Sequence, residues 1–213
     1  EDSIYHIARG FAAYLHKACI NDCVVGFGAR ATSESFHLSA IKGLTQSGIN
    51  VVDIGTATTP MSYWAQYYLK TKGLMMVTAS HNPAGWNGVK LGTDYSSTLL
   101  TEGINEVYSI IEKEEYINGL GKVTKAEIKN AYEDDLIGRA KISKKFKILV
   151  NTGNGTAGLF APDLLRKAGC VVVEHLTNVD PTYPNYTANP DGTAMMEDTG
   201  KQTTTNNCDL GFA

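Results

Sequence analysis

The sequence predicts an α/β protein of two successive domains, and two observations lead to this fold class. Short apolar runs alternate with longer segments whose apolar residues recur at helical spacing, which is the pattern of strands followed by helices. The order strand, loop, helix, glycine, strand occurs at residues 23–53 and again at 148–173, which indicates two copies of one α/β unit. We therefore expect two domains of similar topology with mixed sheets flanked by helices, the second domain being incomplete.

Helices and strands alternate from the first residues onward. The opening segment is predicted to be an amphipathic helix because its apolar residues recur every three or four positions. They are Ile4, Ile7, Ala8, Phe11, Ala12 and Leu15. A strand follows at residues 23–27, and a helix then runs from a cap at Ser33 to about Ser47, where Gly48 is a stop signal.

The next strand, residues 51–55, leads into a helix that begins at Thr59, with Pro60 in the first turn that proline favours. Four aromatic residues recur on this helix, and aromatic residues at such spacing usually pack in a core. They are Tyr63, Trp64, Tyr67 and Tyr68. Strands at 73–77 and 89–91 and a helix at 101–115 complete the first half.

The stretch 112–129 is charged and punctuated by glycine, so we place a domain boundary there. The predicted domains are residues 1–122 and 123–213. In the second domain we expect a helix with a solvated acidic face, three strands and a further helix ending at Lys167; the first helix lies at 126–141 and the strands at 146–150, 171–174 and 208–213. The chain begins without Met and stops in a strand, so we expect it to be a fragment.

Composition excludes several classes of function. A net charge of −3 gives no electrostatic case for binding nucleic acid or an anionic membrane. No apolar run approaches the ~20 residues of a membrane span, and no secretory signal opens the chain. The four cysteines fit neither a redox pair nor a zinc site, so we expect reduced thiols in or near cores and a cytoplasmic location. The sequence leaves the oligomeric state open.

The segment 78–90 carries the strongest functional signal. Ser80, followed by His81, Asn82 and Pro83, lies in a turn-rich loop after an apolar strand, which presents a hydroxyl at the carboxyl edge of a sheet. Lys90 lies at the start of the next strand and offers a positive charge. A phosphate-carrying serine needs exposure, main-chain N–H groups and a cation. A structural turn that merely contains these residues is the alternative.

A second candidate site is the pattern Gly153-x-Gly155-x-x-Gly158. It follows a strand, is predicted to open a helix, and is followed by Glu174 at the end of the next strand. This matches the dinucleotide-binding fingerprint, in which glycines let main-chain N–H groups approach a pyrophosphate. Glycines at a strand-to-helix turn also serve packing alone, so a dinucleotide-binding oxidoreductase fragment stays as an alternative.

The run 78–83, followed by 86–90, resembles the phosphoserine loop of the α-D-phosphohexomutases, the family of phosphoglucomutases, phosphomannomutases and phosphoglucosamine mutases. The resemblance covers nearly the whole chain. It extends to the strand and loop ending in Arg30, the strand at 51–55 with its Thr-Pro turn, the second-domain start at 151–158, the Asn-Pro segment at 189–190 and the final strand at 209–213. Phe27 and Gly28 stand where the family usually has an Arg-Asp pair.

The resemblance implies intramolecular phosphoryl transfer on a hexose phosphate, interconverting the 1-phosphate and the 6-phosphate through a phosphoserine and a hexose bisphosphate. It implies Ser80, His81 and Lys90 as catalytic residues and Arg30, Asn82 and Asn87 as phosphate- or substrate-binding residues. It also implies Mg²⁺, held in part by the phosphate on Ser80, with the other ligands expected beyond residue 213. The fragment alone is therefore expected to be inactive. A non-catalytic phosphosugar-binding relative is a further alternative.

Overall fold

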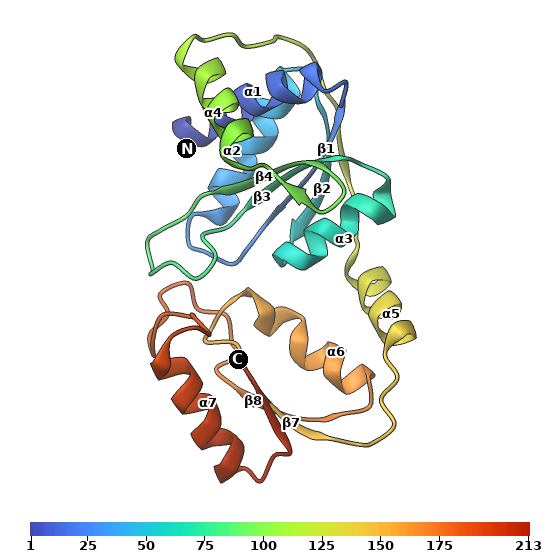
Figure 1. Cartoon of the computed structure of the whole chain (residues 1–213), viewed down its shortest axis with the longest axis vertical. Helices are drawn as coiled ribbons and strands as arrows, with labels where there is room; N and C mark the ends of the chain where they lie inside the picture. The colour runs from blue at the N-terminus through green and yellow to red at the C-terminus, as the bar shows by residue number, and fades with distance from the viewer. The chain divides into compact units, whose positions relative to one another are not determined.

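The computed structural model describes all 213 residues, and its internal contacts divide the chain into two compact α/β units (Figure 1). The first unit comprises Glu1–Gly28, Thr32–Thr78 and Asn87–Ile128, and the second comprises Ala29–Ala31, Ala79–Trp86 and Lys129–Ala213. The predicted fold class is confirmed. The main chain crosses between the units several times, the last time after Ile128, and the domain boundary between residues 122 and 123 stays a prediction. No helix has the length and apolar character needed to cross a membrane.

The first unit is built on a six-stranded mixed sheet with the strand order β5-β4-β3-β1-β2-β6. Its strands are β1 (Asp22–Phe27), β2 (Asn50–Thr56), β3 (Gly73–Val77), β4 (Val89–Asp94), β5 (Ser97–Thr98) and β6 (Val123–Lys125). β1 is parallel to β2 and β3, β2 is parallel to β6, and β4 is antiparallel to both β3 and β5. The short strands β5 and β6 were not predicted, because two or three residues are too few to show an alternating pattern.

Helices cover both faces of this sheet. α1 (Asp2–Lys17), α2 (Ser33–Gln46) and α4 (Thr101–Glu112) lie on one face and α3 (Thr59–Leu69) on the other (Figure 1). The core beneath α1 and α2 contains Phe11, Leu15, Leu44, Val25 and Met75, all fully buried. These helices and the longer strands agree with the predicted positions. Ser33 does not cap α2, because the helix already begins at this residue and Thr32 is its N-cap.

The aromatic residues of α3 do not form core, contrary to expectation. The helix buries Met61, Ser62, Ala65 and Gln66. Tyr67 and Tyr68 are 57% and 55% exposed, and Trp64 stacks on Tyr68 with ring centroids 4.6 Å apart. Helical spacing is satisfied equally by the buried and the exposed stripe, so periodicity alone does not tell which face packs on the sheet.

The second unit has a three-stranded parallel sheet with the order β8-β7-β9. Its elements are α5 (Lys129–Arg139), β7 (Lys147–Asn151), a 3₁₀ helix (Thr156–Leu159), α6 (Ala161–Lys167), β8 (Val171–His175), α7 (Thr193–Thr205) and β9 (Leu210–Phe212). α6 packs against β8, and α7 packs against β7 and β9. α7 was not predicted, because it is rich in threonine, a residue of low helix propensity.

Two side-chain predictions change in this structure. Glu133 is 1% exposed rather than solvated, and its carboxylate binds Lys167 Nζ at 2.5 Å. This hydrogen bond raises the pKa of Lys167, although desolvation opposes the rise. All four cysteines are free, as predicted, but Cys19 is exposed.

Candidate active site

The serine loop, residues 79–86, follows β3, and Arg30 follows β1. These strands are parallel neighbours in which Phe27 is paired with Val77. Arg30 and Ser80 therefore come equally far after paired residues, and parallel strands end at the same edge of a sheet. This is the carboxyl edge, where open α/β sheets bind their ligands. The topology thus explains why two residues distant in sequence belong to one site.

The serine loop consists of two consecutive turns. Asn82 N–H donates to the carbonyl oxygen of Ala79 at 3.0 Å, and Trp86 N–H donates to that of Pro83 at 3.3 Å. Ser80 has a φ of +53°, in a region that side-chain-bearing residues rarely adopt. Gly85 has a φ of +86°, as the third position of a type II turn requires. The loop therefore presents Ser80, which is exposed, on a backbone held in an uncommon conformation.

Arg30 holds this loop through its carbonyl groups. The guanidinium donates from Nη1 to Pro83 O at 2.8 Å and from Nη2 to Ser80 O at 3.0 Å and Asn82 O at 2.7 Å. The side chain belongs to a residue that is only 9% exposed. Hydrogen bonds from a charged donor are stronger than neutral ones. The residue predicted to bind phosphate is thus engaged with the backbone of the serine loop.

His81 lies beside the serine hydroxyl. Its Nδ1 is 3.3 Å from Ser80 Oγ, and both residues are exposed. This distance allows a weak hydrogen bond in either direction, depending on which ring nitrogen carries the proton. His81 is therefore suited to hold or deliver a proton at Ser80 Oγ.

Asn87 secures the far end of the serine loop. Its Nδ2 donates to Thr32 Oγ1 and to Ser33 Oγ, both at 3.1 Å, and its Oδ1 accepts from Gly88 N–H at 3.0 Å. Ser33 is buried at the first residue of α2. Asn87 therefore links the end of the loop to the start of α2, a role that sequence reasoning did not assign to it.

Lys90 lies on β4 opposite Met76 and is half-buried. It forms no hydrogen bond or ion pair with the other predicted site residues. The structure thus brings Ser80, His81, Asn82 and Arg30 together by direct contacts. Asn87 instead bonds to the start of α2, and Lys90 lies on β4.

The first unit also contains a buried histidine–aspartate pair. His37 Nε2 lies 2.9 Å from Asp53 Oδ1, and Gly55 N–H donates to the same carboxylate oxygen at 2.9 Å. Burial lowers the pKa of His37, and this effect outweighs that of the Asp53 carboxylate, which raises the pKa. Because the carboxylate only accepts, the imidazole proton lies on Nε2. His37 Nδ1 is buried without a hydrogen-bond partner.

The glycine turn, residues 152–158, bonds the N–H groups of all three pattern glycines within the protein. Gly153 N–H donates to Asn151 Oδ1, Asn154 N–H to Leu176 O, and Gly155 N–H to Thr152 O. Gly158 N–H donates to the carbonyl oxygen of Gly155. A 3₁₀ turn follows, and α6 begins only at Ala161. The glycine N–H groups that the dinucleotide-binding pattern requires are therefore already bonded to the protein.

The acidic residue of the dinucleotide-binding pattern, Glu174, also has its hydrogen-bond partners within the protein. Glu174 accepts hydrogen bonds from Arg166 Nη2 and, at 2.5 Å, from Thr177 Oγ1. The bond from Thr177 and then that from Arg166 lower the pKa of Glu174. The dinucleotide-binding interpretation is therefore not supported by the structure, and these residues stabilise the second unit.

A network of polar side chains in the second unit escaped sequence reasoning. Asn151 and His175 are paired last residues of β7 and β8. Asn151 Nδ2 donates to Tyr186 Oη at 2.7 Å, Tyr186 Oη donates to Asp198 Oδ2 at 2.9 Å, and His175 Nε2 lies 2.7 Å from the same oxygen. Burial would raise the pKa of Asp198, but the bonds from His175 and Tyr186 lower it overall. No motif in the sequence signals this network, because its members come from four separate segments.

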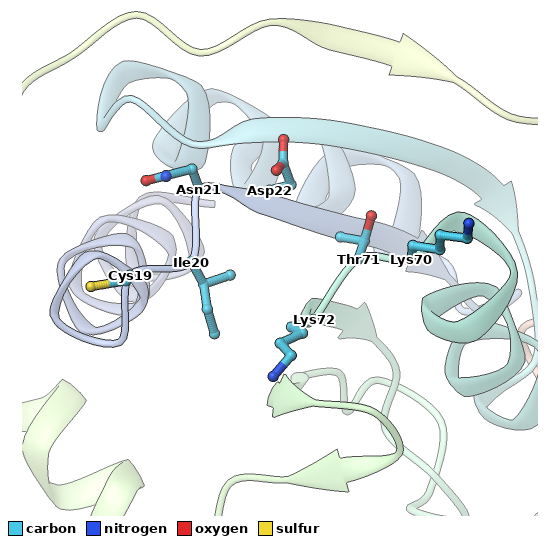
Figure 2. A pocket seen from close by; sticks show the side chains of 7 residues that line it. All are labelled: Cys19, Ile20, Asn21, Asp22, Lys70, Thr71 and Lys72. Carbon is cyan, nitrogen blue, oxygen red and sulfur yellow. The ribbon is translucent and has the colours of Figure 1, made fainter.

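Two further observations limit where ligands bind. A pocket of about 190 Å³ lies at the opposite, amino edge of the first sheet, between the start of β1 and the segment 70–72 before β3. Figure 2 shows that the charged ends of Lys70 and Lys72 point away from each other in it, whereas binding sites have polar groups that converge.

No group of three or more His, Cys, Asp or Glu residues could hold a metal ion.

Comparison with known proteins identifies the family. Residues 1–118 match the model of phosphoglucomutase/phosphomannomutase α/β/α domain I, and residues 114–213 match that of α/β/α domain II. The chain belongs to the phosphoglucomutase/phosphomannomutase family. The two matches span all of the chain, so both α/β units belong to this family and the resemblance seen in the sequence is confirmed.

Individual relatives agree with this family assignment. The chain is 33% identical to a phosphoglucomutase of Neisseria gonorrhoeae and 32% identical to a phosphomannomutase/phosphoglucomutase of Pseudomonas putida, covering 100% of this chain and 46% of each relative. The crystal structure of a phosphoglucomutase/phosphomannomutase family protein from Burkholderia thailandensis superimposes with a TM-score of 0.94 at 25% identity. The match covers 100% of this chain and 48% of the Burkholderia chain. The chain therefore spans about half the length of these members of the family.

Proposed function

We propose that the full-length parent protein is a phosphohexomutase that moves a phosphoryl group between the 1- and 6-positions of a hexose, with Ser80 as the phosphoryl carrier. The relatives whose sequences match include a phosphoglucomutase and a phosphomannomutase/phosphoglucomutase, which supports a hexose phosphate as substrate. A hexose bisphosphate is the proposed intermediate. The cytoplasmic location remains a prediction from the sequence.

One observation carries this proposal. Ser80 is exposed at the carboxyl edge of the first sheet, on a loop whose conformation is held by a buried guanidinium. A serine hydroxyl is a weak nucleophile on its own. A serine that already carries a phosphoryl group needs exposure and a cationic environment more than it needs a strong base, and the loop offers both.

The proposed reaction balances as two transfers. In the first, the Oγ–P bond of phosphorylated Ser80 breaks while a hydroxyl oxygen of the sugar phosphate bonds to phosphorus; the sugar hydroxyl gives its proton to a base, and the leaving Ser80 Oγ takes up a proton. In the return step the Ser80 hydroxyl gives up its proton as Oγ takes the other phosphoryl group from the bisphosphorylated sugar, and the sugar oxygen that is released takes up a proton. His81 is the residue positioned to handle the proton at Ser80 Oγ. Lys90 is the second candidate for this role and would also offset charge on the transferring oxygens.

Mg²⁺ is the proposed cofactor. The residues of this chain fit it only in part, since no cluster of three metal-ligating side chains is present and the phosphoryl oxygens on Ser80 would supply one ligand. When bound, the ion would neutralise charge on the transferring phosphoryl group. Holding it otherwise requires ligands that this chain does not bring together.

Phosphorylation of Ser80 is the test of the proposal. The intact mass of the full-length parent protein is measured before and after incubation with glucose 1,6-bisphosphate. We expect one added phosphoryl group, absent in Ser80→Ala, and a loss of mutase activity of more than about 10³-fold in that variant. Ser96→Ala is a matched control, because Ser96 is also exposed and has a φ of +54°; it should keep both phosphate and activity.

Other outcomes would separate the alternatives. Phosphate on Ser80 without turnover in the parent protein would favour a non-catalytic phosphosugar-binding relative. No phosphate on Ser80 under any condition would contradict the mutase proposal. The 213-residue chain alone is expected to show no turnover, and robust mutase activity of that chain would overturn this expectation.

A further inference from the structure

The contacts of Arg30 reveal how the serine loop is oriented. Its two terminal nitrogens bond three carbonyl oxygens of the loop, those of Ser80, Asn82 and Pro83, at 2.7–3.0 Å. A guanidinium presents its N–H donors in one rigid plane, so it fixes the positions of several acceptors at once. The residue is buried, and the carbonyl side of the loop faces it.

Covalent geometry determines where the N–H groups of the same peptide bonds point. No peptide bond in the chain is cis, and in a trans peptide the C=O and the N–H point in opposite directions. Because Ser80 C=O points toward Arg30, the N–H of His81 points away from it. Because Pro83 C=O points toward Arg30, the N–H of Ala84 also points away. The peptide between Asn82 and Pro83 has no N–H, because proline lacks one.

The two outward N–H groups both follow Ser80 in the sequence and have no bond to another backbone group. Outward N–H groups of consecutive turns form concave anion sites in other proteins. The positive charge of Arg30 lies on the far side of the loop, where it attracts an anion without contacting it.

We propose that Arg30 is a positioning residue: by binding three loop carbonyls it aims the main-chain N–H groups of His81 and Ala84 at the phosphoryl group on Ser80. This rests on the proposed function, since it concerns the phosphorylated state of Ser80. It replaces the expectation that Arg30 binds phosphate directly. The phosphate is then bound by the main-chain N–H groups of His81 and Ala84, and Arg30 acts by holding these groups in position.

The first test measures the order of the loop. Phosphoserine is encoded genetically at position 80 of the 213-residue chain, and ¹⁵N relaxation is recorded for His81 and Ala84. We expect order parameters near about 0.85 in the unsubstituted chain and below about 0.6 in Arg30→Ala. Arg139→Ala is the matched control, because Arg139 is exposed and pairs only with Asp135 along its own helix. A loop as ordered in Arg30→Ala as in the control would overturn the proposal.

The second test separates positioning from direct phosphate binding. The pKa of phosphoserine 80 is followed by ³¹P NMR and is expected to lie below the value of about 6 for a phosphate in water. In Arg30→Ala and also in Arg30→Lys it should return toward about 6, because lysine keeps the charge but lacks the planar set of donors. If Arg30→Lys keeps the low pKa, the arginine acts as a charge and the positioning role is wrong.

The amide signals complete the test. His81 and Ala84 amide protons should shift downfield when residue 80 carries phosphate, and the shift should vanish in Arg30→Ala. Unchanged amide signals would overturn the role of the two N–H groups. Since phosphoserine is encoded, these readouts remain valid even if the parent protein never phosphorylates Ser80 by itself, and the two proposals therefore fail separately.

Discussion

The serine loop and the glycine turn differ in which side of the peptide groups is bonded to protein. Both follow a parallel strand and both are rich in turn-forming residues. In the serine loop, carbonyl oxygens bond a buried arginine. In the glycine turn, the N–H groups of Gly153, Asn154, Gly155 and Gly158 bond to protein oxygen atoms. A phosphate needs donors, and the N–H groups of His81 and Ala84 are bonded to no other backbone group, whereas those of Gly153, Gly155 and Gly158 all have partners in the protein.

The two segments also use glycine for different reasons. In the serine loop Gly85 provides a positive φ and has open space around it. In the glycine turn a Cβ on Gly158 would lie 1.9 Å from Thr177 O. Glycine there permits close approach of two backbone segments, which is a packing function. A glycine-rich pattern after a strand therefore does not by itself indicate a ligand site.

Gly158→Ala should produce the largest effect. The added methyl group meets a backbone carbonyl that has little room to move, so we expect a loss of about 3 kcal/mol or more in the free energy of unfolding of the second unit. Gly85→Ala should lose only about 1–2 kcal/mol, from its positive φ alone. Urea denaturation followed by circular dichroism measures both. Equal losses in the two variants would remove the distinction between the two glycines.

Asn87→Ala is expected to have an intermediate effect. It removes three hydrogen bonds, two to Thr32 Oγ1 and the buried Ser33 Oγ and one from Gly88 N–H, so we expect a loss of about 1–2 kcal/mol in the free energy of unfolding. Asn105→Ala is the control, since Asn105 is exposed in the middle of α4, where alanine is the better helix former. A neutral Asn87→Ala would mean that the end of the serine loop does not depend on α2.

Tyr186→Phe should give the smallest effect, a change in how the free energy of unfolding depends on pH. Burial raises its pKa to about 12, with Asn151 lowering and Asp198 raising it. The unfolded chain has a tyrosine pKa of about 10, so the stabilising contribution is fully present below about pH 10 and is lost as the pH rises through about 12. We compare urea midpoints of the unsubstituted chain and Tyr186→Phe at about pH 8 and about pH 11. Tyr186→Phe should lose less stability over this interval, and an identical decline in both would contradict the prediction.

The sequence allowed much of the first unit to be predicted. Residues 73–77 form the predicted strand to the residue, because an unbroken apolar run bounded by turn-formers has one straightforward interpretation. The threonine-rich α7 and the two-residue β5 lacked such patterns. Their stability depends on neighbours in the fold, such as the antiparallel partner β4 of β5.

The candidate site was predicted only as a set of residue types. Ser80, His81 and Arg30 could be named because family motifs and turn chemistry mark them. The role of Arg30 could not, since its partners are main-chain oxygens fifty or more positions away, and a carbonyl group carries no side-chain signal. The bonds of Asn87 to the hydroxyls of Thr32 and Ser33 were not predicted either, because these partners lie 55 and 54 positions away in the sequence.

By itself, the sequence determined the order of helices and strands, the family, and the position of an exposed serine after a buried strand. Local propensity and apolar spacing are encoded residue by residue, so they can be read along the chain. Only the tertiary structure decided which peptide groups of each loop face the protein and which face outward. That choice depends on contacts between segments far apart in sequence, and it is what distinguishes the serine loop from the glycine turn.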